Sequence, residues 1–499
     1  MTGFSCDVSH NCPTFQCMLP TEKRCASSTS TTILLTPNRT EDAVVSLTRR
    51  GFLGGVLAAG AWSSATGQAF SAPKPAPSPA AGAPGDVAIE WNMIAQNVLQ
   101  PAMTPMAAPT TGAAMPTMPG MSMPRAFVIL SYAHAAMYNA VVAIEGGYQP
   151  WMVATTAPAG ASAPAAAAAA VHAVLVKYLP QQKDMLDMEL WDTLKALGST
   201  SGDRTKGTAV GRAAADAVLA LRAGDVLSTP SPYIYPDPAP GVWEPFPLPT
   251  NPPTIPPPLD PWVATLKPFV MTTPSQFRPG PPPGLGSRTY VRDLEEVRLM
   301  GGLNSTARTE EKTEIARFWQ TNGVIQYNEM FRAVAQQRKL GLLEAARFFA
   351  MGNLIGTDSM VAAFDAKYHY GFWRPWSAIR RADEDGSATT IPDPHWMHLA
   401  MLPNHPEYVA AHTTFASATA ELLTVFLGTS RIGITLNSTT SALSPTWNYA
   451  TAEDLRSQVI NARTWGGLHY RNSSVVGNDV GRRVAVHALK NHFLPASRR

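Results

Sequence analysis

Cysteine is nearly absent from this 499-residue sequence, and its four cysteines (Cys6, Cys12, Cys17 and Cys25) all lie near the N-terminus. The rest of the chain therefore has no disulfide, no thiolate metal ligand and no cysteine nucleophile. Charged residues are also scarce, at 15%, and the net charge is only +3. Because Lys and Arg form no cluster with interleaved aromatic residues, the sequence argues against nucleic-acid binding.

Long apolar runs are missing as well. Beyond the N-terminal region no stretch reaches about 18 uninterrupted apolar residues, so we expect no membrane span in the mature chain. The sequence also lacks the phosphate-binding Gly-Lys-Ser/Thr loop, the His-Glu-x-x-His zinc motif and the Gly-x-Ser-x-Gly nucleophile motif. Hydrophobic residues nevertheless make up 45% of the chain, which is enough for one large or two medium domains.

The N-terminal region resembles a twin-arginine export signal. Ser46–Leu53 reads Ser-Leu-Thr-Arg-Arg-Gly-Phe-Leu, an apolar stretch follows to Trp62, and small residues then offer a cleavage site. We expect an N-terminal extension and signal over 1–72 and a Pro/Ala linker over 73–86, with the mature protein periplasmic or secreted. The alternative is a disordered N-terminus with an accidental arginine pair.

Helical periodicity dominates the remaining sequence, and alternating β patterns are scarce. We therefore expect a mainly α protein built of helical bundles, with an N-terminal part over 87–285 and a C-terminal part over 286–499. The predicted helices cover Val87–Leu99, Arg125–Ile144, Ala161–Leu179, Lys183–Leu197, Arg204–Leu221, Tyr290–Leu299, Thr306–Trp319, Gly341–Lys367, Glu407–Leu427, Glu453–Arg463 and Asn478–Phe493.

Two segments of the N-terminal part lack any helical period. Residues 101–124 are rich in Pro and Thr and contain six methionines between Met103 and Met123. Thioethers can bind copper(I), but the irregular spacing of these methionines favours a loop. Residues 230–283 hold 20 of the 45 prolines, which predicts an extended meander. Its aromatic residues indicate that this meander lies against the body of the protein.

Three C-terminal segments carry the candidate chemistry, and the first joins two cations. Lys367 and Arg374 are seven positions apart, which predicts that they lie near one face of a helix that ends before Pro375. Such a pair suits an oxyanion, since Arg offers a planar fork and Lys a point charge. A solvated helix face is the alternative, although the aromatic spacer between the two residues disfavours it.

The other two segments each contain a histidine. His412 follows small residues at a predicted helix start, where an imidazole can act as acid or base beside a ligand. A core histidine with satisfied hydrogen bonds is the alternative. In Arg463-Thr-Trp-Gly-Gly-Leu-His469 the paired glycines break a helix and permit close backbone approach. Here the alternative is a helix cap followed by a surface histidine.

The order Lys-x6-Arg-Pro, x-x-x-His at a helix start and Arg-x5-His resembles the signature of one superfamily. This is the superfamily of vanadium-dependent haloperoxidases and type-2 phosphatidic acid phosphatases. The segments Asp365–Arg380 and His405–Tyr408 are similar to its bacterial and plant haloperoxidase-like branch. Further likeness lies upstream, so that the resemblance covers most of the chain from Val87 to Phe493, as in Glu90-Trp-Asn, Ala133–Asn139 and Asn304–Thr309.

The resemblance implies an oxyanion site. Lys367, Arg374 and Arg463 would bind the oxygens of vanadate or phosphate, together with the backbone N–H at Ala411. This agrees with the physics, because a multiply charged oxyanion removed from water needs several cations and donors at once.

The resemblance also implies three catalytic residues. His469 would be the apical ligand of vanadium, or the nucleophile toward phosphorus. His412 would be the acid/base near the opposite apical oxygen, and Lys367 would withdraw charge. A coordinating His469 must be neutral, so it needs a hydrogen-bond acceptor that fixes its tautomer.

The sequence departs from the family pattern at two positions. The usual Pro-Ser-Gly-His is Val-Ala410-Ala-His412 here, which removes a hydroxyl donor but keeps the backbone N–H groups. The usual Asp four residues after the second histidine is Ser473, so the partner of His469 stays open, with Asp479 as a distant candidate.

By resemblance, the function is that of an exported haloperoxidase. It would bind vanadate, which acts as a Lewis acid, and use hydrogen peroxide to oxidise halide to hypohalous acid. Its other partner would be an organic acceptor, and a homodimer stays open. The missing hydroxyl at Ala410 favours bromide or iodide over chloride. Two alternatives remain, an acid phosphatase with a phospho-His469 intermediate and a non-catalytic oxyanion-binding protein.

Overall fold

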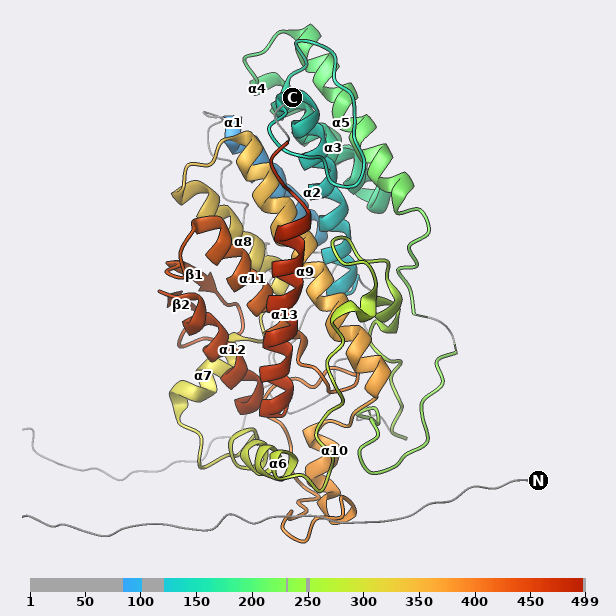
Figure 1. The fold of residues 1–499 in the computed structure, drawn as a ribbon, viewed down its shortest axis with the longest axis vertical. Helices are drawn as coiled ribbons and strands as arrows, with labels where there is room; N and C mark the ends of the chain where they lie inside the picture. Colours follow the sequence, from blue (N-terminus) through green and yellow to red (C-terminus); the bar gives the residue numbers. More distant parts are fainter. Residues whose placement is uncertain (1–83, 101–120, 230–231, 248–251, 497–499) are drawn as a thin grey trace, which may run out of the picture. The chain divides into compact units, whose positions relative to one another are not determined.

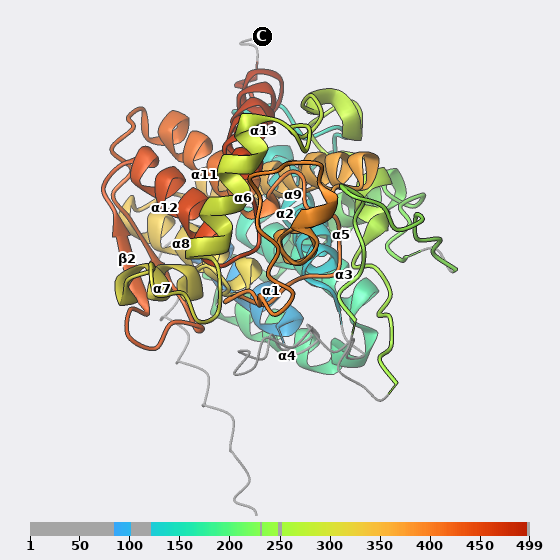
Figure 2. The same ribbon diagram turned by 90° about the horizontal axis from the view of Figure 1, so that it is seen from below.

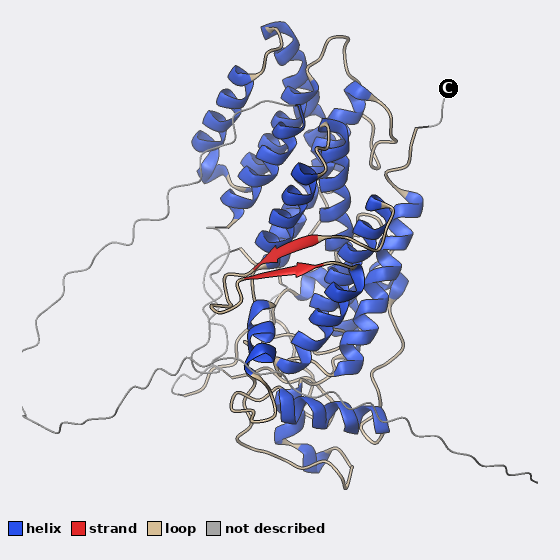
Figure 3. Cartoon of the chain, turned by 90° about the vertical axis from the view of Figure 1, so that its left-hand side faces the viewer, coloured by secondary structure: helices blue, strands red, loops and turns tan. Residues whose placement is uncertain are grey.

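Helices make up nearly all the regular structure of the described residues, which are 84–100, 121–229, 232–247 and 252–496 of a computed structural model. The protein is therefore mainly α, as predicted (Figure 1, Figure 3). The signal-like segment, the linker to residue 83 and most of the Met-rich segment lie outside the described residues. The described residues all belong to one unit that starts at Ala76, and the division near residue 285 stays a prediction.

The helices are α1 (Pro84–Leu99), α2 (Met123–Glu145), α3 (Ala163–Tyr178), α4 (Lys183–Ala196), α5 (Ser201–Leu221), α6 (Arg288–Met300), α7 (Glu310–Phe318), α8 (Gly323–Gln337), α9 (Leu342–Tyr370), α10 (Pro375–Arg380), α11 (Ala411–Leu427), α12 (Ala452–Trp465) and α13 (Arg471–Asn491). The described strands are β1 (Ile434–Asn437) and β2 (Thr446–Tyr449), which pair antiparallel. Helix α8 was not predicted, because buried polar residues such as Gln326 and Asn328 interrupt its apolar pattern.

Helix α9 is the centre of the helical packing. It contacts α1, α2, α11 and α13, and 23 of its residues are buried (Figure 1, Figure 2). Helix α11 approaches it closely at Gly356, where an added Cβ would lie 2.4 Å from the ring of Phe415. A helix that is apolar on all sides belongs in the interior of a bundle. Lys367, in the last turn of α9, is therefore carried into the core.

Helix α2 is the described helix that is long and apolar enough to cross a membrane. It is packed against α3, α5, α8 and α9, and 18 of its residues are buried. Its composition is thus explained by its position among other helices, since a buried core helix needs apolar residues on every face.

The Pro-rich segment is an irregular meander that lies against α9, as predicted. It contains two short 3-10 helices, at Pro261–Thr265 and Pro274–Phe277. The carboxylate of Asp358 in α9 accepts the backbone N–H groups of residues 269–271 at 2.7–2.8 Å. Further along, Arg278 forms a two-bond pair with Asp365, each bond 2.7 Å long. Buried carboxylates of α9 thus hold a segment that has few backbone hydrogen bonds of its own.

The prediction that Lys367 and Arg374 share one helix face is wrong. Helix α9 ends at Tyr370, where Gly371 adopts the left-handed conformation (φ +55°) and its N–H bonds to the carbonyl of Lys367. Glycine stops a helix in this way without a steric penalty. Arg374 lies beyond this turn as the N-cap of α10, so the two cations come from separate elements.

Candidate active site

The structure brings the five candidate side chains together from three regions of the C-terminal part. These regions are the end of α9 with the turn into α10, the start of α11, and the end of α12 with the turn into α13. In chain order the side chains are Lys367, Arg374, His412, Arg463 and His469.

Arg374 connects the regions by hydrogen bonds. Its Nη1 donates to the carbonyl of Leu468 at 2.9 Å and to Nε2 of His469 at 3.2 Å. Its Nε donates to the carbonyl of His405 at 2.9 Å, and its Nη2 donates to Nδ1 of the same residue at 2.9 Å. The guanidinium therefore fixes the α12–α13 turn to the loop before α11.

The ammonium of Lys367 is fully buried. Its Nζ donates to the carbonyls of Pro406 at 3.0 Å and Glu407 at 2.8 Å. Because an ammonium has three hydrogens, one is left for a ligand. The Nη1 of Arg463 donates to the carbonyl of Trp319 at 3.0 Å, while its buried Nε has no partner among the described residues. An unpaired buried donor of this kind is suited to a bound anion.

Glu407 is the orienting partner of His469, and the sequence did not reveal this role. The Nδ1–H of His469 donates to Oε1 of Glu407 at 2.8 Å, and the same oxygen accepts the N–H of Tyr470 at 3.2 Å. The alternative candidate, Asp479, is wrong, because it lies on an exposed part of α13 beside Arg483. A carboxylate can only accept, so the proton is on Nδ1 and the lone pair is on Nε2.

The site has an excess of positive charge. Burial lowers the pKa of Lys367 well below its usual range, and the neighbouring Arg374 and Arg463 lower it further. Burial, followed by the charge of Arg374, also lowers the pKa of Arg463 to about 9. In the described part of the chain, Glu407 is the carboxylate that acts on this cluster, and burial raises its pKa to about 7. Three buried cations with so little compensation need an anionic ligand.

The site histidines are neutral for the same reasons. Burial lowers the pKa values of His412 and His469 well below the usual range, and the three cations add to the effect. His405 behaves likewise, next to Lys367 and Arg374. A neutral imidazole keeps a lone pair, which it can offer to a metal centre or use to take up a proton.

The N-terminus of α11 adds backbone donors. Ala410 is its N-cap and provides no side-chain cap, while Ala411 and His412 begin the first turn. The first amides of a helix have no intrahelical acceptor and carry the positive end of the helix dipole. The predicted donor at Ala411 thus lies where an anion is stabilised by the backbone.

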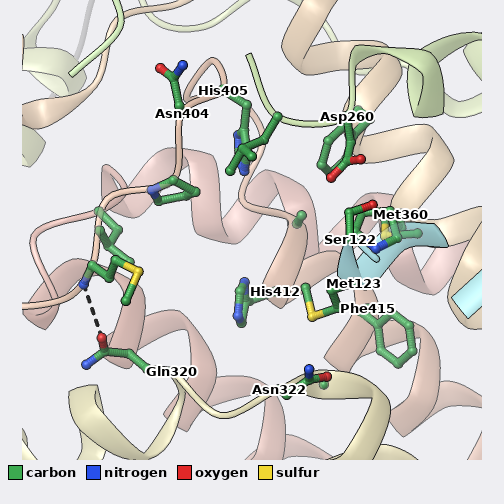
Figure 4. A pocket seen from close by; sticks show the side chains of 18 of the residues that line it. Ser122, Met123, Asp260, Gln320, Asn322, Met360, Asn404, His405, His412 and Phe415 are labelled. Carbon is green, nitrogen blue, oxygen red and sulfur yellow. Dashed lines mark hydrogen bonds between the residues drawn. The ribbon is translucent and has the colours of Figure 1, made fainter. Parts of the chain in front are cut away.

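A cavity of about 310 Å³ lies beside the cluster. Arg463, His412 and His469 line one part of it, and Figure 4 shows His412 with His405 and Asp260 around this space. Most of the remaining wall is apolar and includes Met121, Met123, Pro124, Phe127, Phe246, Leu259, Trp319, Tyr327, Met360, Phe364 and Phe415. A volume and lining of this kind suit a small organic molecule.

Sequence reasoning missed three polar residues of this region. Glu407 and His405 belong to the His405-Pro-Glu-Tyr segment, which was noted only as a family likeness. A carboxylate in an otherwise apolar stretch just before His412 was the available signal for Glu407. Asp260 lies in the Pro-rich meander, and nothing in that irregular segment indicated that it lines the cavity.

Within the described ranges, no three His, Cys, Asp or Glu side chains gather into a metal site. The three cations and the single oriented imidazole instead suit an oxyanion. That imidazole is His469, whose neutral Nε2 accepts a hydrogen bond from Arg374.

Comparison with known proteins agrees with this geometry. Residues 347–494, which carry all five candidate residues, match the family model of the VCPO second helical-bundle domain. The vanadium chloroperoxidase of Curvularia inaequalis is 27% identical over a region that covers 28% of this chain and 28% of that protein. Residues 347–494 therefore form a domain of the VCPO second helical-bundle type. The curated match spans less than a third of the relative's length.

Solved structures of vanadium haloperoxidases share the fold over most of the chain. A bacterial vanadium-dependent iodoperoxidase superposes with a TM-score of 0.64 and 20% identity, and covers 82% of this chain and 96% of its own. A bacterial vanadium-dependent chloroperoxidase in its apo form superposes with a TM-score of 0.59 and 18% identity, and the match covers 74% of this chain and 94% of that chain. At these identities the likeness establishes the haloperoxidase fold.

Proposed function

We propose that this protein is an exported, vanadate-dependent haloperoxidase, which oxidises halide with hydrogen peroxide to hypohalous acid. The observation that carries the proposal is the buried cluster of Lys367, Arg374 and Arg463 around neutral imidazoles at the edge of an apolar cavity. These residues fit vanadate, because three cations converge beside the one carboxylate of Glu407 and His469 has an oriented lone pair.

Each residue has a role that follows from its position. Lys367, Arg374 and Arg463 would hold the oxygens of the anion, and the N–H groups at the start of α11 would add further donors. Nε2 of His469 would be the protein ligand of the bound vanadate, while Nδ1–H donates to Glu407. Bound vanadate supplies a Lewis-acidic centre that activates hydrogen peroxide toward attack by halide.

His412 is the acid/base of the site. Its pKa is held low by burial and by the three cations, so the imidazole is unprotonated and keeps its lone pair. It lines the same cavity as His469 and Arg463. This imidazole would take up a proton from hydrogen peroxide that enters the cavity and would give that proton back later in the cycle.

Ala410 sets the expected halide range. It stands at the N-cap of α11 and brings no hydroxyl to the anion. A charge-assisted hydrogen bond is worth roughly 1.5–3 kcal/mol, so its absence leaves the activated oxygen less polarised. This loss matters most for the halide that is hardest to oxidise. We therefore expect bromide and iodide oxidation with little chloride activity.

The test is a set of parallel assays on the vanadate-loaded protein. Bromide, iodide and chloride oxidation are measured with hydrogen peroxide, beside hydrolysis of a chromogenic phosphate ester by the vanadate-free protein. We expect bromide and iodide oxidation and little hydrolysis. Hydrolysis without halide oxidation would instead indicate a phosphatase that uses His469 as nucleophile. Neither activity, with tight vanadate binding, would indicate an oxyanion-binding protein.

A further inference from the structure

Four methionines line the cavity beside the candidate active site. Met121 and Met123 are the last two of the Met-rich run noted in the sequence, while Met360 comes from α9 and Met401 from the loop before His405. The side chains of Met123 and Met360 are drawn with His412 around this cavity in Figure 4. Three of the four are buried, with exposed fractions of 9% for Met121, 4% for Met360 and 8% for Met401.

Thioethers are reactive toward the product of the proposed function. A hypohalous acid reacts with a methionine so that a sulfur–oxygen bond forms and the oxygen–halogen bond breaks. The sulfur is oxidised by two electrons and the halogen is reduced by two, and halide and a proton are released. Because the halide is returned, one halide ion can pass through many such cycles while hydrogen peroxide is consumed.

We propose that Met121, Met123, Met360 and Met401 are modification sites, oxidised to methionine sulfoxide by hypohalous acid formed in their own cavity. This inference rests on the proposed haloperoxidase function. The oxidant forms where Arg463, His412 and His469 line the cavity, and the methionines line the same space. It therefore encounters these thioethers before it reaches bulk solvent, despite their low exposure.

The chain contains its own reference set for this inference. Met152, Met185 and Met188 are outside the cavity and are exposed by 59%, 38% and 66%. A hypohalous acid supplied from solution oxidises accessible thioethers first, since susceptibility follows exposure. Oxidant released inside the cavity reverses this order. The order of oxidation thus reports where the oxidant arises.

The experiment uses the vanadate-loaded full chain with bromide. Hydrogen peroxide is added in substoichiometric steps, and each methionine is followed by peptide mass spectrometry as a gain of about 16 Da. We expect the sulfoxide fraction of the cavity methionines to exceed that of Met152 and Met188 on the order of tenfold. Hypobromite added directly to the vanadate-free protein is expected to give the opposite order.

Three results would overturn the inference. One is oxidation of the exposed methionines first, or of both sets equally, while a soluble phenol in a parallel sample is brominated. Another is cavity oxidation that proceeds equally without bromide or without vanadate, since peroxide itself would then be the oxidant. If the phenol is not brominated and no methionine is oxidised, the proposed function fails together with the inference.

A variant gives a second readout. Met123→Leu combined with Met360→Leu keeps the apolar volume but removes two thioethers. At less than one equivalent of peroxide per chain, this variant is expected to brominate more of the phenol than the wild type does. Equal bromination by the two proteins would contradict competition from the cavity methionines. Met152→Leu with Met188→Leu is the matched control and is expected to behave as wild type.

Discussion

Glu407 fixes the tautomer and the orientation of the His469 imidazole. Its carboxylate receives Nδ1–H of the imidazole, and Arg374 donates to Nε2 from the other side. Outer partners of this kind typically contribute about 10- to 100-fold to metal affinity. The same carboxylate is also a negative charge near a site for an anion, so its removal has two opposing effects.

These two effects predict a change of selectivity in Glu407→Leu, which removes both the charge and the acceptor of Nδ1–H. Affinity for phosphate, which needs only the cations, is expected to hold or rise as the negative charge is lost. Affinity for vanadate, which needs the oriented His469, is expected to fall about 10-fold or more. Titration calorimetry with both anions measures the ratio of vanadate affinity to phosphate affinity. Asp479→Asn, on the exposed face of α13, is the control. An unchanged ratio in Glu407→Leu would exclude an orienting role.

At the scale of residues, the sequence identified the cations and histidines but not all of their partners. Lys367, Arg374 and Arg463 were predicted from the resemblance of their order and spacing to the superfamily signature, and the structure brings them together. Glu407 was missed because its contact with His469 spans 62 positions, and such pairing is decided by tertiary packing. Asp479 was chosen as a candidate partner of His469 because it is near in sequence, but its side chain is exposed on α13 beside Arg483.

At the scale of elements, the turn between α12 and α13 places His469. Gly466 ends α12, and Gly467 adopts φ +76°. A Cβ at Gly467 would lie 2.5 Å from the carbonyl oxygen of Gly301. Only glycine combines this backbone conformation with so close an approach. The turn therefore delivers His469 to Arg374 through a contact with the region that follows α6.

Gly467→Ala is predicted to damage both stability and the site. The left-handed conformation costs a residue with a Cβ roughly 1–2 kcal/mol, and the clash adds to this cost and displaces His469. Gly428→Ala has a similar positive φ of +68°, with nothing within 4 Å of the new Cβ. Both variants should have a lower melting temperature than the wild type, but only Gly467→Ala should lose vanadate affinity. Equal vanadate affinity in the two would show that the close contact does not position His469.

Element boundaries were predicted well where local signals set them. Thr309 caps α7 and Thr451 caps α12 through their own side chains, within a few residues of the expected starts. The end of α9 was placed at Lys367 by periodicity and just before Pro375 by the spacing of the two cations, whereas Gly371 ends it between these positions. Helix α8 was missed because its buried Asn328 bonds with Asn92 and Asn353, contacts that periodicity does not show.

At the scale of the whole molecule, buried neutral histidines link folding to pH. Burial lowers the pKa of His134 to about 4, and that of His398 likewise to about 4. Each is unprotonated in the folded protein over a range where the unfolded chain binds a proton. Stability is therefore full above the ordinary value of 6.5 and is lost as pH falls toward 4. Asp358, with its pKa raised to about 6, opposes this trend over part of the range.

The melting temperature of the anion-free protein is thus predicted to fall as the pH is lowered from about 6.5 to about 4. His134→Asn removes one of the groups responsible, so its melting temperature should depend less steeply on pH, although the variant is less stable overall. Scanning calorimetry at several pH values measures the slope. A slope as steep as that of the wild type would show that His134 is not linked to folding.

Export is a proposal that rests on the sequence, because Arg49 and Arg50 lie outside the described residues. A reporter fused after residue 86 is expected to reach the periplasm of a bacterium with a working twin-arginine pathway. Replacement of both arginines by lysine is expected to retain it in the cytoplasm. Export of the double variant at the wild-type level would point to another route. A homodimer likewise stays a prediction.

The most direct test of the central claim is bromide oxidation as a function of vanadate concentration, in the wild type and in His469→Ala. The wild type is predicted to be inactive without vanadate and to reach a plateau as vanadate is added. His469→Ala, with an unchanged circular dichroism spectrum, is predicted to stay inactive at concentrations that saturate the wild type, because the oriented Nε2 is gone. Full activity of His469→Ala at saturating vanadate, or bromide oxidation by the wild type without vanadate, would contradict the account.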